Sequence, residues 1–558
     1  MRTKVIRIVL CVLMLTAVFG YEIPHNTNAD VIVNEEWVAR YNGFTNGWDV
    51  GSAIAVDSSG NVYSTGRSYG NGTYYDYTTV KYDNSGNELW VARYNGPGND
   101  RDEPADIVLD TLGNAYVTGL SIGNATSWDY ATIKYDSLGN ELWVVRYDGP
   151  EYSVDSAEAI AIGESGNIYV TGGSKGECTT IAYDSNGNEL WIARYSSPEG
   201  SGGRGLDIAL DQSGNIYVTG GESGNGTDTD SVTIKYDSDG NELWVARYNG
   251  PGNGRDRSYG IELDSLGNVY IAGDSYGNGT DSDYFTIKYD PNGTELWVVR
   301  YDGPGNDEDI VHDMDIDSLG NVFVTGHSYG TITHSDATTV AYDSSGNELW
   351  VARFNGPVNY FECSHSIAVD SLLKKVYVTG DSYSNVKYYD IVTITYDYNG
   401  NELWVARYDG PGNRNDGAYG IATDSSQNVY VTGYSWGNGS FYDFVTIKYS
   451  QKVSILQAII DIDPDTLNLK SKGRWITCYI DLPGYDVNDI DIGTILLEDT
   501  ISAEWGDVQN DTLMVKFDRS EVEDLLSPGN YNLKVTGELT DGIEFKGFSD
   551  EIRVIEPP

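Results

Sequence analysis

The sequence predicts an all-β protein, and two regularities carry that prediction. Tryptophan recurs from Trp37 to Trp404 at spacings of 53, 53, 48, 53, 53, 53 and 54 residues. Between successive tryptophans lie short runs of β-branched and aromatic residues, each bounded by turn formers. A unit of four strands copied at this period is typical of a β-propeller. We therefore expect residues 30–450 to form an eight-bladed β-propeller with four antiparallel strands per blade.

The first full copy contains all four strands that we expect in a blade. They are Ala53–Asp57, Asn61–Gly66, Tyr77–Asp83 and Glu88–Asn95. The segments Asp57–Gly60 and Asp83–Gly86 predict hairpin turns, because Asp bonds its local backbone and Gly accepts positive φ. The fourth strand carries bulky residues on both sides, which predicts a sheet packed between two others.

The two ends of the repeat array complement each other. Trp37 has no hairpin signal before it, and the last third-strand signal, Phe444–Ser450, has no tryptophan strand after it. We expect the strand around Trp37 to be the outermost strand of the last blade and to close the ring non-covalently. Closure would remove the exposed edges of an open array.

Tryptophan and an arginine three residues later recur together in every copy. A buried Trp side chain covers roughly 150–250 Å², so eight of them are expected to wedge neighbouring blades together. Because every blade has the arginine, we interpret it as structural, with a carboxylate partner nearby, rather than as an anion site. The arginines are Arg40, Arg93, Arg146, Arg194, Arg247, Arg300, Arg353 and Arg407.

These motifs resemble a known repeat. The run Asp83–Trp90 (DNSGNELW) with Asn61–Gly66 (NVYSTG) is similar to the bacterial and archaeal β-propeller repeat SBBP, which occurs in secreted and surface proteins. The resemblance covers nearly all of residues 35–450. It implies a propeller at the cell exterior and no established enzymatic activity.

The N-terminus and the charge indicate where the chain works. Arg2, Lys4 and Arg7 precede the apolar run Ile8–Phe19, a pattern typical of a secretory signal peptide and too short for a confident membrane span. We expect residues 1–29 to be a signal peptide and leader, and the mature chain to be secreted or at the cell surface without a transmembrane segment. The formal charge of −49 argues against nucleic-acid binding, because phosphates would be repelled.

Residues 451–558 break the repeat and predict a small, immunoglobulin-like β-sandwich. Ser520–Glu523 reads as a capping box that opens one short helix. The expected strands are Val453–Asp463, Trp475–Asp481, Gly493–Glu498, Thr512–Phe517, Asn530–Thr536 and Glu551–Ile555.

Aromatic residues in the loops between second and third strands are candidate ligand-binding residues. They would emerge on one face of a propeller, where rings beside Asn, Asp and Arg can stack on sugars and bond their hydroxyls. The alternative is that these rings pack their own loops, and the sequence does not decide between the two. The candidates are Tyr69, Tyr276, Tyr329, Tyr383 and Trp436.

An aspartate precedes the third strand in seven copies and is the candidate metal ligand. A ring of carboxylates could hold Ca²⁺, the only cofactor that the sequence suggests. We favour the alternative that each Asp bonds backbone within its own blade. The residues are Asp76, Asp129, Asp230, Asp283, Asp336, Asp390 and Asp443.

The sequence contains no recognisable catalytic motif. Four cysteines and five histidines lack CxxC, HExxH or other paired spacing, so we expect neither a disulfide framework nor a zinc site. The non-consensus segments Val311–Met314 and Phe361–His365 are interpreted as drift. The repeat also resembles, one residue short, the tryptophan-docking motif of eight-bladed quinoprotein dehydrogenases, whose vicinal disulfide this chain cannot form.

The leading hypothesis is a non-catalytic propeller that binds glycans or cell-surface proteins through its loop face. It depends on the near identity of the blades, which multiply one surface. The first alternative is an extracellular enzyme with a channel-mouth site, either a quinoprotein-like dehydrogenase or a polysaccharide lyase or hydrolase. The second is a structural component of the cell envelope.

Overall fold

The structure is a computed structural model that describes residues 31–556, except 125–126, 151–152, 199–201, 224–227, 333, 385–387, 454–455, 484, 510–511 and 541–542. The leader expected at residues 1–29 lies outside the described residues. The described chain divides into two compact units, residues 34–450 and 451–558. Across the described residues, no helix combines the length and apolarity needed to span a membrane.

The first unit is built from eight four-stranded antiparallel sheets. The first strands are β2 (Asp49–Val56), β6 (Asp102–Leu109), β10 (Asp155–Ile162), β14 (Arg204–Leu210), β18 (Asp256–Leu263), β22 (Asp309–Ile316), β26 (Glu362–Asp370) and β30 (Asp416–Thr423). The second strands are β3 (Val62–Tyr69), β7 (Ala115–Ile122), β11 (Ile168–Ser174), β15 (Ile216–Ser223), β19 (Val269–Tyr276), β23 (Val322–Tyr329), β27 (Lys375–Tyr383) and β31 (Val429–Trp436).

The third and fourth strands complete each sheet in chain order. The third strands are β4 (Tyr75–Tyr82), β8 (Trp128–Tyr135), β12 (Glu177–Tyr183), β16 (Thr229–Tyr236), β20 (Ser282–Tyr289), β24 (Ser335–Tyr342), β28 (Tyr389–Asp397) and β32 (Tyr442–Val453). The fourth strands are β5 (Glu88–Tyr94), β9 (Glu141–Tyr147), β13 (Glu189–Tyr195), β17 (Glu242–Tyr248), β21 (Glu295–Tyr301), β25 (Glu348–Phe354), β29 (Glu402–Tyr408) and β1 (Val31–Tyr41).

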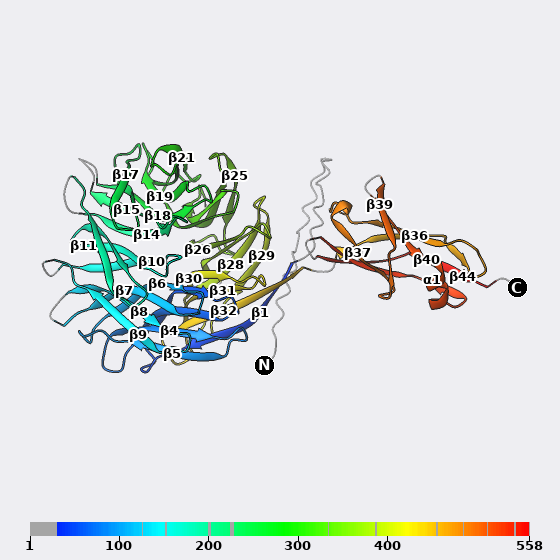
Figure 1. Ribbon diagram of the computed structural model, residues 1–558, viewed down its shortest axis with the longest axis horizontal. Helices are drawn as coiled ribbons and strands as arrows, with labels where there is room; N and C mark the ends of the chain where they lie inside the picture. Colours follow the sequence, from blue (N-terminus) through cyan, green and yellow to red (C-terminus); the bar gives the residue numbers. More distant parts are fainter. Residues whose placement is uncertain are drawn as a thin grey trace. The chain divides into compact units, whose positions relative to one another are not determined.

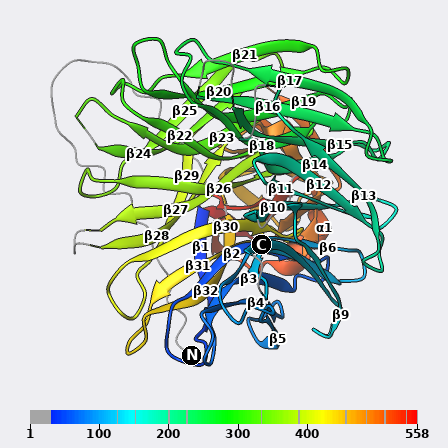
Figure 2. The same cartoon turned by 90° about the vertical axis from the view of Figure 1, so that its left-hand side faces the viewer.

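The sheets form a closed ring, with the first strands on its inner side. Each first strand contacts the first strand of the next sheet, and β30 contacts β2 to complete the circuit. Figure 2 shows the sheets in succession around the ring, from blue to yellow. The all-β, propeller-like arrangement predicted from the repeat is confirmed.

The N-terminal strand closes the ring as predicted. β1 pairs with β32, so the last sheet runs β1-β32-β31-β30 and joins the two ends of the repeat array (Figure 1). An ion pair of 2.9 Å between Arg40 of β1 and Asp443 of β32 supports this closure. No covalent bond links the two strands, so the seam depends on packing, hydrogen bonds and this charge pair.

Tryptophan joins each sheet to the next, as expected. The indole N–H of Trp90 donates a 3.1 Å hydrogen bond to the Ser137 carbonyl in the next sheet's hairpin. Gly139 of that hairpin has φ +85° and lies against the ring, where an added Cβ would be 2.6 Å from Trp90 Cδ2. The same hydrogen bond to the next hairpin is made by Trp37, Trp90, Trp143, Trp191, Trp244, Trp297 and Trp350.

The fourth strand is less enclosed than predicted. Its leucine is about half exposed, as for Leu89 at 51 % and Leu296 at 52 %. The prediction that both faces of this strand are packed is confirmed at its centre, where Val91 and Trp90 pack against two different buried clusters, and is wrong only for the leucine. The physical reason is that sheets fanning out from one axis diverge toward their outer edges, where the fourth strands lie.

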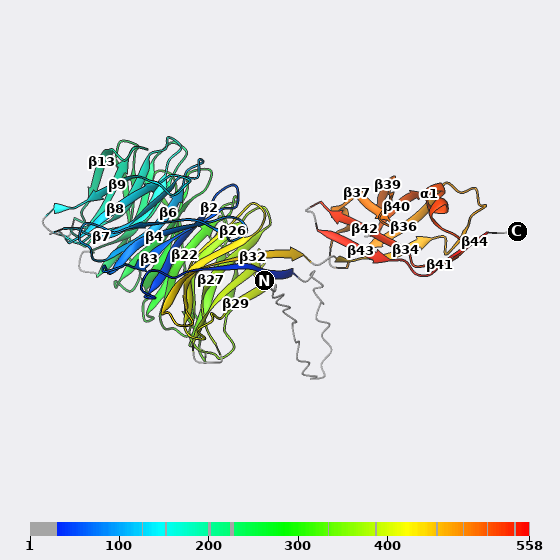
Figure 3. The same cartoon turned by 90° about the horizontal axis from the view of Figure 1, so that it is seen from below.

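The second unit contains two larger sheets and one small sheet, shown in orange and red in Figure 3. One sheet has the order β33 (Leu456–Gln457), β43 (Glu544–Phe548), β42 (Lys534–Leu539), β37 (Ile490–Leu497) and β38 (Ile501–Ser502). The second comprises β34 (Ile459–Asp463), β36 (Trp475–Asp481), β40 (Thr512–Asp518) and β39 (Trp505–Gln509). The third comprises β35 (Thr466–Asn468), β44 (Ile552–Ile555) and β41 (Gly529–Tyr531).

One hydrophobic core joins these sheets, as in a β-sandwich. Ile480 and Val515 of one sheet and Leu497 and Val535 of the other belong to the same buried cluster. Two short helices complete the unit, namely the 3-10 helix η2 (Val487–Asp489) and α1 (Arg519–Leu525). The immunoglobulin-like assignment stays a prediction.

Three local predictions for the second unit are wrong. The single strand predicted over Val453–Asp463 is divided among β32, β33 and β34, and β33 and β34 belong to different sheets. The N-cap of α1 is Asp518, whose side chain accepts the Ser520 N–H, and not Ser520. The Asp518 carboxylate, two residues before Ser520, accepts the Ser520 N–H, so the helix begins earlier than predicted. The single strand predicted over Asn530–Thr536 is split between β41 and β42, which belong to different sheets.

Candidate functional site

Each first strand contains one residue that the strand pairing skips. In β22, Val311 pairs with Gly326 and Asp313 with Thr325, so His312 is the extra residue of a β-bulge. Bulges re-aim a side chain and are frequent next to functional sites. The extra residues of the eight sheets are Ser52, Ala105, Glu158, Leu206, Tyr259, His312, His365 and Tyr419.

The bulge position is where the repeats differ most in chemistry. Its residues include hydroxyl, apolar, acidic, aromatic and imidazole side chains, whereas the fourth strand reads ELWVARY in β5, β17 and β29 alike. The first strands line the inner side of the ring. Nearly identical blades therefore build an inner surface that is not repeated, which the sequence interpretation did not anticipate.

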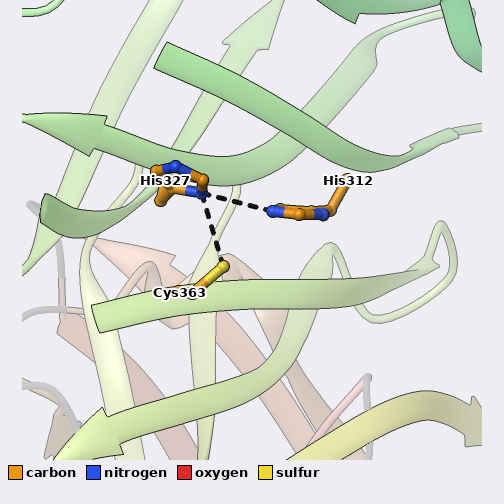
Figure 4. A group of neighbouring side chains, drawn as sticks. All are labelled: His312, His327 and Cys363. Carbon is orange, nitrogen blue, oxygen red and sulfur yellow. Dashed lines mark hydrogen bonds between the residues drawn. The ribbon is translucent and has the colours of Figure 1, made fainter. Parts of the chain in front are cut away.

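Two of these bulge residues belong to a compact group of imidazole and thiol side chains, which we call the His–Cys cluster: His312, His327, Cys363 and His365. Figure 4 shows His327 between His312 and Cys363. His312 Nε2 lies 3.2 Å from His327 Nδ1, and Cys363 Sγ lies 3.5 Å from the same Nδ1. His365 Nδ1 lies 3.9 Å from Cys363 Sγ. The four side chains come from β22 and β23 of one sheet and β26 of the next.

A carboxylate of the following strand orients the fourth member. His365 Nε2 lies 3.2 Å from Asp381 Oδ2 on β27. Asp381 Oδ1 in turn accepts the Ala418 N–H of β30 at 3.2 Å. This arrangement directs Nδ1 of His365 toward Cys363. The cluster and its carboxylate thus connect three consecutive sheets.

Burial keeps two of the imidazoles neutral. It lowers the pKa of His312 to about 3, helped by the neighbouring His365 and His327, and the pKa of His327 to about 4, helped by His365. Burial also opposes the charged form of His365, but Cys363 and Asp381 outweigh it and raise the pKa of His365. Neutral imidazole nitrogens with free lone pairs are the form that binds metals.

Exposed aromatic side chains gather beside the cluster, and we call them the aromatic patch: Trp48, Tyr360, Tyr419 and Phe441. They are 44, 44, 41 and 51 % exposed. Such a concentration of exposed rings in one region marks an interaction site more often than chance exposure.

Ring contacts link Trp48, Tyr419 and Phe441 of the patch, whereas Tyr360 contacts His334 and Tyr383. Tyr419 lies 5.3 Å from His365 and 5.7 Å from Tyr434, measured between ring centroids. Tyr434 contacts Tyr442 at 4.7 Å, and Tyr442 contacts Trp48 at 5.4 Å. These contacts form a continuous series of rings from the His–Cys cluster across the last sheet to the loop that leads into β2.

Charged pairs occupy other parts of the inner ring. Arg67 of β3 pairs with Glu103 of β6 at 2.7 Å. The bulge residue Glu158 of β10 pairs with Arg204 of β14. Each pair joins neighbouring sheets among the first four, whereas the aromatic contacts lie mainly in the last sheets.

The structure brings three of the five predicted aromatic residues toward this region. Tyr329 lies 6.4 Å from His327, and Trp436 lies 5.0 Å from Tyr442. Tyr383 contacts Tyr360 of the patch at 4.5 Å. Tyr69 instead packs on Tyr75 within its own sheet, and Tyr276 is 40 % exposed in a separate sheet. All five stay candidates for ligand binding.

Five of the seven predicted aspartates form ion pairs with the repeated arginine of their own sheet. The pairs are Asp76–Arg93, Asp129–Arg146, Asp283–Arg300, Asp336–Arg353 and Asp443–Arg40, at 2.7–2.9 Å. Asp230 is half-buried, and its sheet pairs Arg247 with Glu222 instead. Asp390 lies near Asp409 and Asp416.

The seven aspartates do not converge on one point. Among the described residues, each close acidic triad contains only one of them: Asp129 with Asp148 and Asp155, Asp283 with Asp302 and Asp309, and Asp390 with Asp409 and Asp416. The interpretation of the arginine as a structural residue with a carboxylate partner is confirmed in six sheets, with aspartate as the partner in five and Glu222 in the sixth. The calcium hypothesis stays a prediction.

The sequence analysis missed the His–Cys cluster, although its residues were noted as departures from the repeat. A signal was present. His312 and His365 hold the same repeat position in consecutive copies, and Cys363 lies two residues before one of them. Placing each histidine in the register of its own repeat, rather than searching for linear spacing, would have placed them on adjacent inner strands.

Comparisons with known proteins support the repeat family. The family model of the SBBP β-propeller repeat matches residues 36–72, 89–124 and 407–440. No curated protein matches the chain.

Several solved structures are similar in fold. A periplasmic gluconolactonase of Pseudomonas aeruginosa is 13 % identical, with a TM-score of 0.37, over 56 % of this chain and 87 % of its own. A glucose dehydrogenase is 8 % identical, with a TM-score of 0.30, over 52 % of this chain and 95 % of its own. A eukaryotic initiation factor is 10 % identical, with a TM-score of 0.35, over 71 % and 90 %. Similarity at these levels carries no argument about activity.

Proposed function

We propose that this chain is a secreted or cell-surface propeller that binds a neutral carbohydrate at the aromatic patch. The observation that carries the proposal is the concentration of four exposed aromatic side chains where the blades stop being alike. Elsewhere the repeated units present the same residues many times. At this place they present a unique combination of rings and polar groups.

Aromatic rings beside hydrogen-bonding groups suit sugars. The C–H face of a pyranose stacks on a ring, and its hydroxyl groups need donors and acceptors around the edge of the same site. The patch offers Trp48 and Tyr419 as stacking surfaces. The Asp381 carboxylate lies beside His365, whose ring is 5.3 Å from that of Tyr419. The carboxylate accepts hydrogen bonds from hydroxyls, and Tyr419 contributes its own phenol.

The charge of the chain selects among carbohydrates. With a formal charge of −49, the protein repels uronates, sulfated glycans and other acidic polymers over the range of the Debye length. A neutral glycan avoids that cost. The expected leader at residues 1–29 would deliver the protein to the exterior, where such glycans are found.

The proposal is tested with a glycan array probed by the full mature protein. The double variant Trp48→Ala/Tyr419→Ala should weaken binding of a neutral oligosaccharide by at least about 10-fold, because it removes two exposed stacking surfaces. Trp505→Ala is the matched control. It removes a tryptophan of similar exposure, 45 %, from the second unit and should bind like the unaltered protein.

Three results would contradict the proposal. The first is that no glycan binds, and the second is that the patch variant and the control variant lose the same affinity. The third is that the chain binds a protein partner that carries no glycan and binds no free glycan. Turnover of a bound oligosaccharide would instead support the extracellular-enzyme alternative. Ordered self-assembly without ligand would support an envelope component.

A further inference from the structure

We propose that His312, His327, Cys363 and His365 bind one zinc ion. None of the sequence motifs indicates this site, and it does not depend on carbohydrate binding. The proposal revises the expectation, drawn from linear spacing, that the chain has no zinc site.

The distances between donor atoms match a tetrahedral zinc site. With Zn–N near about 2.0–2.1 Å and Zn–S near about 2.3 Å, tetrahedral angles place two nitrogens about 3.3 Å apart and a nitrogen and a sulfur about 3.6 Å apart. The corresponding separations are 3.2 Å for His312 Nε2 to His327 Nδ1 and 3.5 Å for Cys363 Sγ to that Nδ1. His365 Nδ1 is 3.9 Å from Cys363 Sγ but does not belong to the group of three donors that lie within 4.8 Å of one another, so its ring must move toward the ion to become the fourth ligand.

Hydrogen bonding alone accounts poorly for the cluster. His327 Nδ1 has two close neighbours, His312 Nε2 and Cys363 Sγ. A neutral imidazole nitrogen either donates one hydrogen or accepts with one lone pair, so it satisfies one of the two well. A cation placed between the donor atoms satisfies all of them at once. Three of these atoms lie within 4.8 Å of one another.

The surroundings resemble those of a bound metal. A ligating histidine usually donates its second ring N–H to a carboxylate, which fixes the tautomer and the ring orientation. Asp381 holds this position at 3.2 Å from His365 Nε2, and the Ala418 N–H fixes Asp381 in turn. The Nδ1 of His365 is thereby the ring nitrogen that faces the cluster, and an ion bound there would displace the proton from it.

The donor set distinguishes zinc from other ions. Calcium and magnesium require oxygen ligands, whereas this cluster provides three imidazoles and one thiol. Four protein donors complete a tetrahedron without an open position, which is the pattern of structural zinc sites. Such a site would fasten β22 and β23 to β26 and so hold two sheets together at the inner edge of the ring.

The test is metal analysis of the full mature protein, produced without a polyhistidine tag and dialysed after zinc loading. We expect about one zinc ion per chain, lost in His327→Ala and in Cys363→Ser. Cobalt substitution should give the visible absorption of a tetrahedral ion and a thiolate charge-transfer band, and Cys363→Ser should abolish that band. Asp381→Asn should weaken zinc affinity by about 10–100-fold while keeping the cobalt spectrum.

Controls separate binding from folding. His334→Ala removes an exposed histidine of the same sheet outside the cluster and should retain the metal. Circular dichroism of each variant, recorded before metal loading, identifies any variant that fails to fold. The zinc titration of Asp381→Asn tests the site in a variant that keeps all four proposed ligands. The proposal is overturned if loaded protein holds no zinc, or if His334→Ala loses as much metal as His327→Ala.

Discussion

Arg93 shows how a single repeated residue stabilises a seam between sheets. Its guanidinium forms a 2.9 Å ion pair with the buried Asp76 and donates to Ser68 Oγ at 2.7 Å within its own sheet. It also donates to the Tyr41 hydroxyl at 2.9 Å, and Tyr41 belongs to β1 of the last sheet. The same side chain therefore satisfies a buried carboxylate and crosses the place where the ring closes.

Replacing Arg93 with methionine should destabilise the first unit strongly. The change keeps much of the apolar stem but leaves Asp76, 6 % exposed, without its ion-pair partner. Removing one partner of a buried pair typically costs about 3–5 kcal/mol. Equilibrium unfolding in guanidinium chloride measures the loss.

Arg407→Met is the matched control for Arg93→Met. At that seam Phe354 replaces the tyrosine, and Arg407 packs over its ring at 5.4 Å. Burial and then Asp409 and Asp416 raise the pKa of Asp390 to about 7, so this carboxyl can take up a proton once the arginine is gone. Arg407→Met should therefore lower the free energy of unfolding by less than Arg93→Met does. Equal losses in the two variants would contradict this explanation.

At the level of elements, the hairpin between the third and fourth strands of one sheet packs over the tryptophan of the preceding sheet. Gly139 serves two purposes, because its φ of +85° suits glycine and its missing side chain leaves room for Trp90. Gly214 has a similar φ of +79° in another hairpin, but nothing lies within 4 Å of an added Cβ. A comparison of the two positions therefore separates the cost of the left-handed backbone from the cost of a clash with the indole.

Gly139→Ala should therefore cost more than Gly214→Ala. The control should lose about 1 kcal/mol from the left-handed backbone alone. Gly139→Ala should lose at least about 1–3 kcal/mol more, because the methyl group meets the indole and forces it from its packing. Parallel thermal or guanidinium unfolding of both variants measures the difference. Similar losses in the two variants would show that the contact between Gly139 and the Trp90 indole does not contribute to stability.

Sequence patterns located some strands well and others poorly, for a physical reason. β5 and β36 begin at the predicted residue, since alternation and flanking turns define them. β2 begins at Asp49, four residues before the predicted Ala53. The bulge at Ser52 interrupts the period of two and so hides the first half of the strand. That hidden half is the segment in which other copies carry the residues of the candidate site.

For the molecule as a whole, three carboxyls on the inner side of the ring influence one another. Asp106, Asp207 and Asp313 follow the bulge in alternate sheets, and each accepts a backbone N–H of the next sheet. Burial raises the pKa of Asp106 and Asp313 to about 6 and that of Asp207 to about 8, and repulsion from Asp313 adds to the rise at Asp106 and, with repulsion from Asp106, to the rise at Asp207.

These shifts predict that stability falls as the pH rises. The folded-state pKa values lie above the unfolded value near about 3.9, so the folded chain holds more protons between roughly pH 4 and pH 8. The free energy of unfolding contributed by these groups therefore decreases across that window. Unfolding measured at pH 5 and at pH 8.5 should show greater stability at pH 5.

Asp207→Ala tests the source of this pH dependence. Other sheets carry Ala53 or Ala159 at the same position, so alanine fits the strand. The variant should show a flatter decline in stability between pH 5 and pH 8.5 than the unaltered protein. An unchanged slope would exclude Asp207 as its source.

The sequence alone determined the repeated element, the closure by the strand around Trp37 and the structural role of the arginine. All three follow from local periodicity, because a strand, its turns and its packing residues are specified within one copy. Only the tertiary structure decided which residues of different copies meet. His312 and Cys363 are 51 positions apart in the chain, and the curvature of the ring brings their strands into contact. Two bulges, one in β22 and one in β26, then bring His312 and His365 into one cluster, and no linear pattern reveals them.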